Sequence, residues 1–177
     1  MKDSQNAAAG QPQKDTAAVR LLFVCTGNIC RSPTAEGVFR ARAIEAGLEH
    51  RVRADSAGTH GYHVGEAPDP RSCATALRRG VDLSSLRGRK VTVQDFDRFD
   101  LLLAMDRGHL RALQALAPPG KADRAHLFLH FAPRLGLQDV PDPYYGGEEG
   151  FERVLDMIEA ACDGLLEHLT QTRLTQP

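Results

Sequence analysis

The sequence lacks an excess of charge of either sign, and this balance excludes one broad class of partner. Its 177 residues contain 22 lysines and arginines against 23 aspartates and glutamates, a formal net charge of −1. Domains that bind nucleic acid through the phosphate backbone usually carry a basic face, so we expect no nucleic-acid partner.

Long apolar runs are missing as well. No stretch approaches the roughly 20 apolar residues that a membrane-spanning helix needs. The polar N-terminal residues contain no apolar core of a secretory signal. We therefore expect no association with a membrane and a cytoplasmic location.

Cysteine is scarce, with only Cys25, Cys30, Cys73 and Cys162 in the chain. Four cysteines are too few for a disulfide scaffold, and no cluster of cysteines and histidines has the spacing of a zinc site, so we predict no metal site. In a reducing compartment, such thiols serve catalysis or redox chemistry more often than cross-linking. Cys73 and Cys162 fall on the apolar faces of helical patterns, and we interpret them as inert core thiols.

What the chain does contain is enough apolar material for one core, since 42% of its residues are hydrophobic. Short apolar runs alternate with helical patterns, which predicts an α/β fold with a parallel sheet covered by helices on both faces. We expect one domain over residues 18–171, a disordered N-terminal tail over 1–17 and a disordered end over 172–177. The predicted strands are 19–24, 52–56, 100–104 and 126–129; the predicted helices are 33–46, 70–79, 107–117 and 151–169, with a helical turn at 92–95 and a loop at 131–147.

The segment after the first strand, VCTGNICRSP, combines several features that favour an anion. Gly27 and Asn28 readily adopt left-handed backbone angles, which can turn successive amides toward one point. The helix that follows aims the positive end of its dipole at that point. Arg31 adds a planar guanidinium that matches two phosphate oxygens, and this field favours the thiolate of Cys25. The loop therefore predicts a cysteine nucleophile for phosphoesters; a buried structural cysteine beside a solvated arginine is the alternative.

This loop, with its Cys-x5-Arg spacing, resembles the signature of the low-molecular-weight protein tyrosine phosphatases. Three further segments resemble that family in order and spacing: DSAGT at 55–59, FDLLLAMD at 99–106 and VPDPYY at 140–145. The resemblance covers about residues 19–169. It implies an open four-stranded parallel sheet with the phosphate-binding loop after the first strand. It also implies hydrolysis of phosphotyrosine without a metal or any other cofactor.

The resemblance assigns three residues to the chemistry itself. Cys25 is the nucleophile that forms a phosphocysteine, Arg31 stabilises the transition state, and Asp142 is the general acid. Asp142 lies between two prolines, so a simple turn residue is its alternative interpretation. The resemblance assigns support of the phosphate-binding loop to Thr26, Gly27, Asn28, Ile29, Cys30, Ser32, Ser56 and Asp106.

Individual roles follow from the same resemblance. Ser32 would hydrogen-bond the Cys25 sulfur, and Asn28 would hold the loop in shape with Ser56 as its partner. Asp106 would brace the loop from the end of the third strand, or cap the next helix. Many relatives add a histidine to the Asn28 network, whereas residues 84–87 read SSLR here, so the replacement of that histidine stays open.

The three tyrosines of the chain, Tyr62, Tyr144 and Tyr145, match positions that wall the substrate pocket in the family. Aromatic walls suit an aromatic ring, although Tyr62 can also be read as a surface loop residue. The substrates would be phosphotyrosine-containing proteins, a tyrosine kinase among the candidates, and the chain would be a monomer or a weak dimer. In the family, the pair that corresponds to Cys25 and Cys30 commonly forms a reversible disulfide, which implies redox sensitivity.

Competing functions on related scaffolds leave different marks in the sequence. Phosphoarginine phosphatases tend to have threonine where this chain has Ile29. Arsenate reductases need relay cysteines beyond the loop, and Cys73 and Cys162 are far apart in sequence. A non-hydrolytic phosphocysteine carrier would lack Arg31 and Asp142. We interpret a final cluster as a solvated face, with substrate docking as the alternative: Arg71, Arg78, Arg79, Arg87, Arg89 and Lys90.

Overall fold

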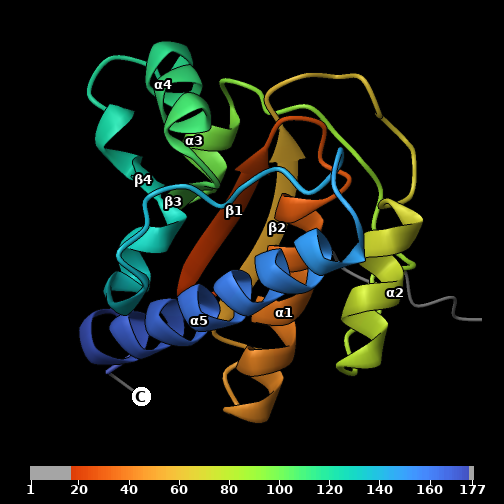
Figure 1. Ribbon diagram of the computed structural model, residues 1–177. Helices are drawn as coiled ribbons and strands as arrows, with labels where there is room; N and C mark the ends of the chain where they lie inside the picture. Colours follow the sequence, from red (N-terminus) through yellow and green to blue (C-terminus); the bar gives the residue numbers. More distant parts are fainter. Residues whose placement is uncertain (1–16, 176–177) are drawn as a thin grey trace, which may run out of the picture.

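Four parallel strands form the centre of the fold in a computed structural model that describes residues 17–175 (Figure 1). The strands lie in the order β2-β1-β3-β4. Parallel strands bring their carboxyl ends to one edge of the sheet, where open α/β sheets bind ligands. Their bounds are β1 Val19–Cys25, β2 Val52–Gly58, β3 Leu101–Ala104 and β4 Ala125–Leu127.

Helices cover both faces of the sheet, as predicted (Figure 1). Two long helices, α1 (Arg31–Glu45) and α5 (Glu148–Thr172), pack on one face. The short α3 (Asp95–Arg98) and α4 (Arg107–Leu116) pack on the other face, and α2 (Pro70–Arg78) lies beside α5. Among residues 17–175, no helix combines the length and the apolarity that a membrane span requires.

The central strand β1 supplies both halves of the core. Leu21 and Phe23 face the cluster beneath α1 and α5, whereas Leu22 and Val24 face the cluster beneath α3 and α4. All four side chains are fully buried. Because successive side chains of a strand point to opposite faces, a strand covered on both sides needs an uninterrupted apolar run.

Two elements at the edges of the predicted pattern differ from it. The helix α1 begins at Arg31 rather than at residue 33, so Arg31 and Ser32, which the prediction leaves in the loop, already belong to the helix. The apolar run at 126–129 is only partly a strand, because Phe128 and Leu129 turn into a 3-10 helix (Phe128–Phe131) that buries them in the core. The predicted loop at 131–147 also contains a short 3-10 helix, Pro133–Leu135.

Residues 172–175 differ from the expected disordered end. Helix α5 ends at Thr172, and Leu174 behind it is buried. The Arg51 guanidinium donates a hydrogen bond to the Leu174 carbonyl at 2.9 Å, so burial and a hydrogen bond hold this segment. The predicted N-terminal tail falls almost entirely on residues 1–16, which lie outside the described residues, as do residues 176–177.

Candidate active site

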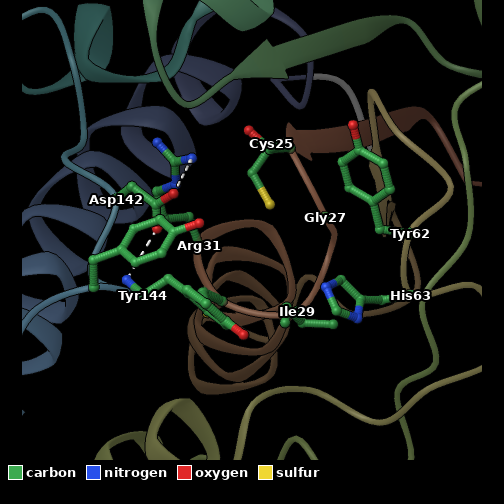
Figure 2. Close-up of a pocket in the computed structure, with 11 residues that line it drawn as sticks. Cys25, Gly27, Ile29, Arg31, Tyr62, His63, Asp142 and Tyr144 are labelled. Atoms are coloured by element: carbon green, nitrogen blue, oxygen red, sulfur yellow. Dashed lines mark hydrogen bonds and ion pairs between the residues drawn. The ribbon is translucent and has the colours of Figure 1, made fainter.

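A cavity of about 230 Å³ opens at the carboxyl edge of the sheet, beside the loop that joins β1 to α1 (Figure 2). Three separate parts of the chain surround it, residues 25–31, 62–63 and 142–145, and the last of these lies more than a hundred positions after the first. The cavity is lined by Cys25, Thr26, Gly27, Ile29, Cys30, Arg31, Tyr62, His63, Asp142, Tyr144 and Tyr145.

Asn28 gives the loop its shape. Its φ of 58° is the one positive φ of a residue other than glycine within residues 17–175. Such a conformation is strained, by roughly 1–2 kcal/mol in general. Its side-chain amide nitrogen donates to the Ser32 hydroxyl at 2.8 Å and to the Ser56 hydroxyl at 2.9 Å, while its oxygen accepts from the Arg89 amide at 3.0 Å. These buried hydrogen bonds offset the strain, and the expected Asn28–Ser56 contact is present.

The Cys25 thiol lies at the end of β1 and points into the cavity (Figure 2). Its sulfur is 3.0 Å from the Ser32 hydroxyl oxygen, the contact that the sequence predicts. Because that hydroxyl already accepts from Asn28, its proton can be directed at the sulfur, which is nearer than its other acceptor, the Ala57 carbonyl at 3.5 Å. Helix α1 begins just after the loop without a side-chain cap, so its first amides can serve an anion.

The Arg31 guanidinium lies against two carboxylates and is only 3% exposed. One of its nitrogens is 3.0 Å from an Asp106 oxygen and also donates to the Val140 carbonyl at 3.0 Å. The other terminal nitrogen is 3.7 Å from an Asp142 oxygen (Figure 2). Asp106 also caps α4 by accepting from the His109 amide, so the contacts that its two interpretations require are both present.

The Asp142 carboxylate is at the mouth of the cavity and partly open to solvent, with 43% of the side chain exposed. One of its oxygens accepts a hydrogen bond from the Tyr144 amide at 3.0 Å. Asp142 therefore has the hydrogen bond that is typical of a turn residue. It also aims the other carboxylate oxygen at Arg31, so the turn and a catalytic role are compatible.

Aromatic side chains form the walls above the loop. Tyr144 and Tyr145 meet edge to face with ring centroids 5.0 Å apart, and Tyr62 stacks on His60 at 5.0 Å. The Arg71 guanidinium lies over the Tyr144 ring, 5.4 Å from its centroid. Tyr62 and Tyr145 are 70% and 90% exposed, so they line the rim rather than the floor.

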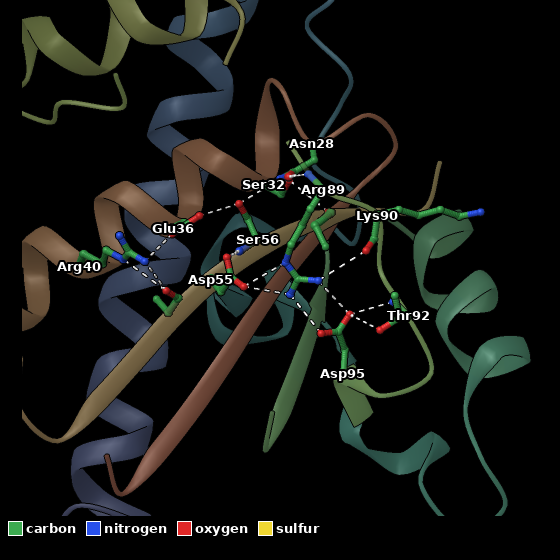
Figure 3. A network of polar contacts seen from close by, with 12 residues as sticks. Asn28, Ser32, Glu36, Arg40, Asp55, Ser56, Arg89, Lys90, Thr92 and Asp95 are labelled. Atoms are coloured by element: carbon green, nitrogen blue, oxygen red, sulfur yellow. Dashed lines mark hydrogen bonds and ion pairs between the residues drawn. The ribbon is translucent and has the colours of Figure 1, made fainter. Parts of the chain in front are cut away.

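A buried polar network beneath the loop answers the question of the missing histidine (Figure 3). No contact of residues 84–87 reaches Asn28 within the described chain; the Arg89 amide does. The Ser56 hydroxyl donates to the Glu36 carboxylate at 2.6 Å, and burial raises the pKa of Glu36. Glu36, Ser56, Asn28 and Ser32 thus form one hydrogen-bonded chain that ends at the Cys25 sulfur.

The solvated-face interpretation is wrong for Arg89. Its guanidinium lies 2.9 Å from Asp55 and 3.0 Å from the fully buried Asp95 (Figure 3). These ion pairs fix the backbone amide that supports Asn28. Sequence reasoning missed Arg89 and Glu36, because nothing in their local pattern identifies the partners that the fold brings to them.

His109 is a further residue that the sequence did not single out. Its imidazole is 95% buried, and Nε2 lies 2.8 Å from the Thr26 hydroxyl. Burial and the nearby Arg31 guanidinium lower the pKa of His109 to about 4. The ring is therefore neutral in the folded protein at neutral pH.

The low pKa of His109 predicts a loss of stability in acid. In the unfolded chain a histidine titrates near 6.5, so below that pH the unfolded state takes up a proton that the folded state refuses, until about pH 4. Between pH 7 and pH 4.5, this single residue should lower the free energy of unfolding by about 2 kcal/mol. Urea unfolding should show a smaller acid loss in His109→Gln than in the parent. His50→Gln, at an exposed position, is the control, and equal losses in all three proteins would contradict the assignment.

Comparisons with known proteins agree on one family. The model of the low molecular weight phosphotyrosine protein phosphatase family matches residues 20–174. A low molecular weight protein-tyrosine-phosphatase of Streptomyces coelicolor is 53% identical over 150 residues, which cover 83% of this chain and 91% of the relative. A crystal structure of a protein tyrosine phosphatase from Entamoeba histolytica has a TM-score of 0.83 at 39% identity, covering 86% of this chain and 97% of that one. YfkJ from Bacillus subtilis has a TM-score of 0.82 at 38% identity, covering 86% and 95%.

Proposed function

Because the chain belongs to the low molecular weight phosphotyrosine protein phosphatase family and is a protein tyrosine phosphatase, we propose that it hydrolyses phosphotyrosine through a phosphocysteine intermediate. The observation that carries the proposal is the meeting of three groups at one cavity. The Cys25 thiol, the Arg31 guanidinium and the Asp142 carboxylate supply a nucleophile, a phosphate clamp and a proton donor.

In the first step, the Cys25 thiolate attacks phosphorus, and the bond between phosphorus and the phenolic oxygen breaks. The loop amides and the Arg31 fork stabilise the charge on the transferring oxygens. Asp142, at the open side of the cavity, gives its proton to the departing phenolic oxygen. The products of this step are free tyrosine hydroxyl and phosphocysteine.

In the second step, water attacks the phosphocysteine and the sulfur–phosphorus bond breaks. The Asp142 carboxylate takes a proton from that water and is thereby reset as an acid. The Cys25 sulfur leaves as a thiolate, which the Ser32 hydroxyl stabilises from 3.0 Å. The chain Glu36, Ser56, Asn28 keeps that hydroxyl oriented toward sulfur.

The residues of the floor and the walls favour phosphotyrosine over phosphoarginine. Ile29 packs with Cys30 and Phe151 and places an apolar side chain where a guanidinium would need a polar partner. The tyrosines at the rim offer ring contacts to a tyrosine substrate. Both Arg31 and Asp142 face the cavity, which favours turnover over a phosphocysteine carrier.

We expect the substrate classes to separate sharply when phosphopeptides are assayed in the presence of a metal chelator. Phosphotyrosine peptides should react roughly 10²-fold faster than phosphoserine or phosphoarginine peptides of the same sequence, because the shorter phosphoserine does not reach Cys25 and phosphoarginine meets Ile29. Ile29→Thr should raise the rate with phosphoarginine, and Val93→Thr on the exposed surface is the matched control. A preference for phosphoarginine in the parent would overturn the substrate assignment.

The cellular setting belongs to the proposal as well. We place the enzyme in the cytoplasm, acting as a monomer or a weak dimer on phosphotyrosine proteins that include a tyrosine kinase. A reducing cytoplasm suits a mechanism that needs the Cys25 thiolate, and all four cysteines are free thiols in the structure.

We expect mild peroxide to inactivate the enzyme reversibly. Burial raises the pKa of Cys30 to about 12, with Asp69 and Cys25 adding to the shift, so Cys30 stays a thiol while Cys25 reacts. Peroxide is reduced to water as the Cys25 sulfur becomes a sulfenic acid; the Cys30 thiol then displaces a second water and closes a disulfide. Peptide mapping should find this bond, and dithiothreitol should restore activity.

The variant Cys30→Ser should recover less activity after the same oxidation, since its Cys25 sulfenic acid has no neighbouring thiol and proceeds to irreversible states. Cys73→Ser, which removes a half-buried cysteine outside the cavity, is the control. Equal recovery of Cys30→Ser and the parent would remove the protective role of Cys30.

A further inference from the structure

We propose that His109 is a positioning residue that ties together the two ends of the phosphate-binding loop, an inference that rests on the proposed function. The loop begins at Cys25 and ends at Arg31, and catalysis requires a fixed separation between the sulfur and the guanidinium. His109 lies on α4, outside the loop, and contacts both ends of it, one directly and one through Asp106.

The contact with the Arg31 end passes through Asp106. One oxygen of this carboxylate lies 3.0 Å from the Arg31 guanidinium. The other oxygen accepts the His109 amide at 2.9 Å and lies 3.1 Å from Nδ1 of the His109 ring. The His109 amide therefore holds the carboxylate by a hydrogen bond, the ring nitrogen lies against the same oxygen, and the carboxylate contacts the guanidinium.

The contact with the other end is direct. Thr26 follows Cys25 in the chain and lines the cavity, and its hydroxyl oxygen lies 2.8 Å from His109 Nε2. The Cys25 carbonyl accepts the Thr59 amide at 2.8 Å and the Thr26 carbonyl accepts the His60 amide at 3.0 Å, so the backbone on both sides of Thr26 is also held from a second side. A shift of α4 would thus displace both ends of the loop, the Cys25 end and the Arg31 end.

The charges around the ring assign its tautomer. Nδ1 faces a carboxylate oxygen at 3.1 Å, where a proton on Nδ1 is attracted and a lone pair is repelled. With the proton on Nδ1, Nε2 is an acceptor and the Thr26 hydroxyl is the donor. The order of contacts is then Thr26 to His109 to Asp106 to Arg31.

A histidine that served packing alone would be a poor choice at this place. Nδ1 is a buried nitrogen whose contact with Asp106 is misaligned for a hydrogen bond, so it has no hydrogen-bond partner within residues 17–175. Burying such a group costs free energy that an apolar side chain of similar size would not cost. An imidazole at this position is explained by its two nitrogens, one of which contacts Thr26 and the other Asp106. Its burial also keeps the ring neutral, so it adds no second positive charge beside Arg31.

The inference predicts how the kinetic constants divide. Loosening the loop ends disturbs the alignment of Cys25 and Arg31 in the transition state more than the binding of the aromatic ring at the rim. The loss should therefore fall on kcat and leave KM within about twofold. We expect Thr26→Val and His109→Leu each to lower kcat about five- to tenfold, the range for one buried hydrogen bond.

The test measures kcat and KM for a phosphotyrosine peptide in Thr26→Val, His109→Leu and the double variant. Because both changes break the same connection, the double variant should be no slower than about twice the slower single variant. His109→Gln, which can place an amide oxygen near the Thr26 hydroxyl, should recover part of kcat. Leu113→Val is the control: it perturbs the buried face of α4 one turn further on, where the Leu113 side chain belongs to the apolar core.

Arg31→Lys supplies an independent measurement. In that background there is no planar guanidinium whose position His109 could fix. Adding His109→Leu to Arg31→Lys should therefore lower kcat less than twofold. Multiplicative losses in the double variant, an unchanged kcat in the single variants, or an equal loss in Leu113→Val would overturn the inference while the parent remains an active phosphatase. A parent without phosphotyrosine hydrolysis would overturn the proposed function and this inference with it.

Discussion

Cys25→Ser should lower turnover of a phosphotyrosine peptide by roughly 10⁴-fold or more, as expected when a nucleophile is removed. A serine hydroxyl is far less acidic than a thiol, and the group next to the sulfur, 3.0 Å away, is the Ser32 hydroxyl, which is too weak a base to activate a serine. The cavity would keep its shape, because serine is close in size to cysteine. Steady-state assays with purified protein measure the loss.

Two observations keep this test specific to the nucleophile. Urea unfolding should place the stability of Cys25→Ser near that of the parent, and calorimetry should show that it still binds a phosphotyrosine peptide through the loop and Arg31. Cys73→Ser removes a different thiol, outside the cavity, and should hydrolyse the peptide at the parent's rate. Near-normal hydrolysis by Cys25→Ser would exclude the phosphocysteine mechanism.

The parts of this protein that could be predicted are those whose physics is local. The strand β1 is a short apolar run, and the loop behind it contains Asn28, a residue type that tolerates the left-handed backbone that the structure shows. The predicted strand at 126–129 is confirmed only in part, because β4 ends at Leu127, and the reason is not local. Phe128 and Leu129 are buried in the core, and a 3-10 helix buries apolar side chains as well as a strand does. An apolar run alone therefore does not distinguish the two.

The distant parts of the site were predictable only through the family resemblance. No periodicity indicates that Asp142 returns to Arg31, or that Tyr144 stands above the loop. Arg89 and His109 escaped both approaches. Each looks like an ordinary surface or helix residue until the fold supplies its partners: Asp55 and Asp95 for Arg89, and Thr26 and Asp106 for His109. The partners of a charged side chain are often distant in the sequence and become neighbours only when the chain folds. The local sequence therefore does not identify them.

Asp142→Asn should affect substrates according to how much their leaving group needs a proton. Asparagine keeps the size and can still accept the Tyr144 amide, so the turn at Asp142 should survive. It cannot give a proton to the phenolic oxygen. The phenol of tyrosine has a pKa of about 10, so its release should slow by roughly 10²–10⁴-fold, the range for one positioned proton donor. A strongly acidic phenol leaves its aryl phosphate as the phenolate anion and needs no proton. Asp142→Asn should therefore release it almost as fast as the parent does.

The measurement is the pre-steady-state release of phenol across a series of aryl phosphates, because the first turnover reports formation of the phosphocysteine alone. The logarithm of the rate plotted against the pKa of the phenol should be nearly flat for the parent, where Asp142 protonates every leaving group. It should fall steeply for Asp142→Asn. Asp139→Asn is the matched control, since Asp139 lies on the same segment, pairs with Arg107 and is not among the residues that line the cavity of Cys25. If Asp142→Asn gave a line as flat as the parent's, the proton would come from elsewhere, and Asp142 would keep only its role in the turn.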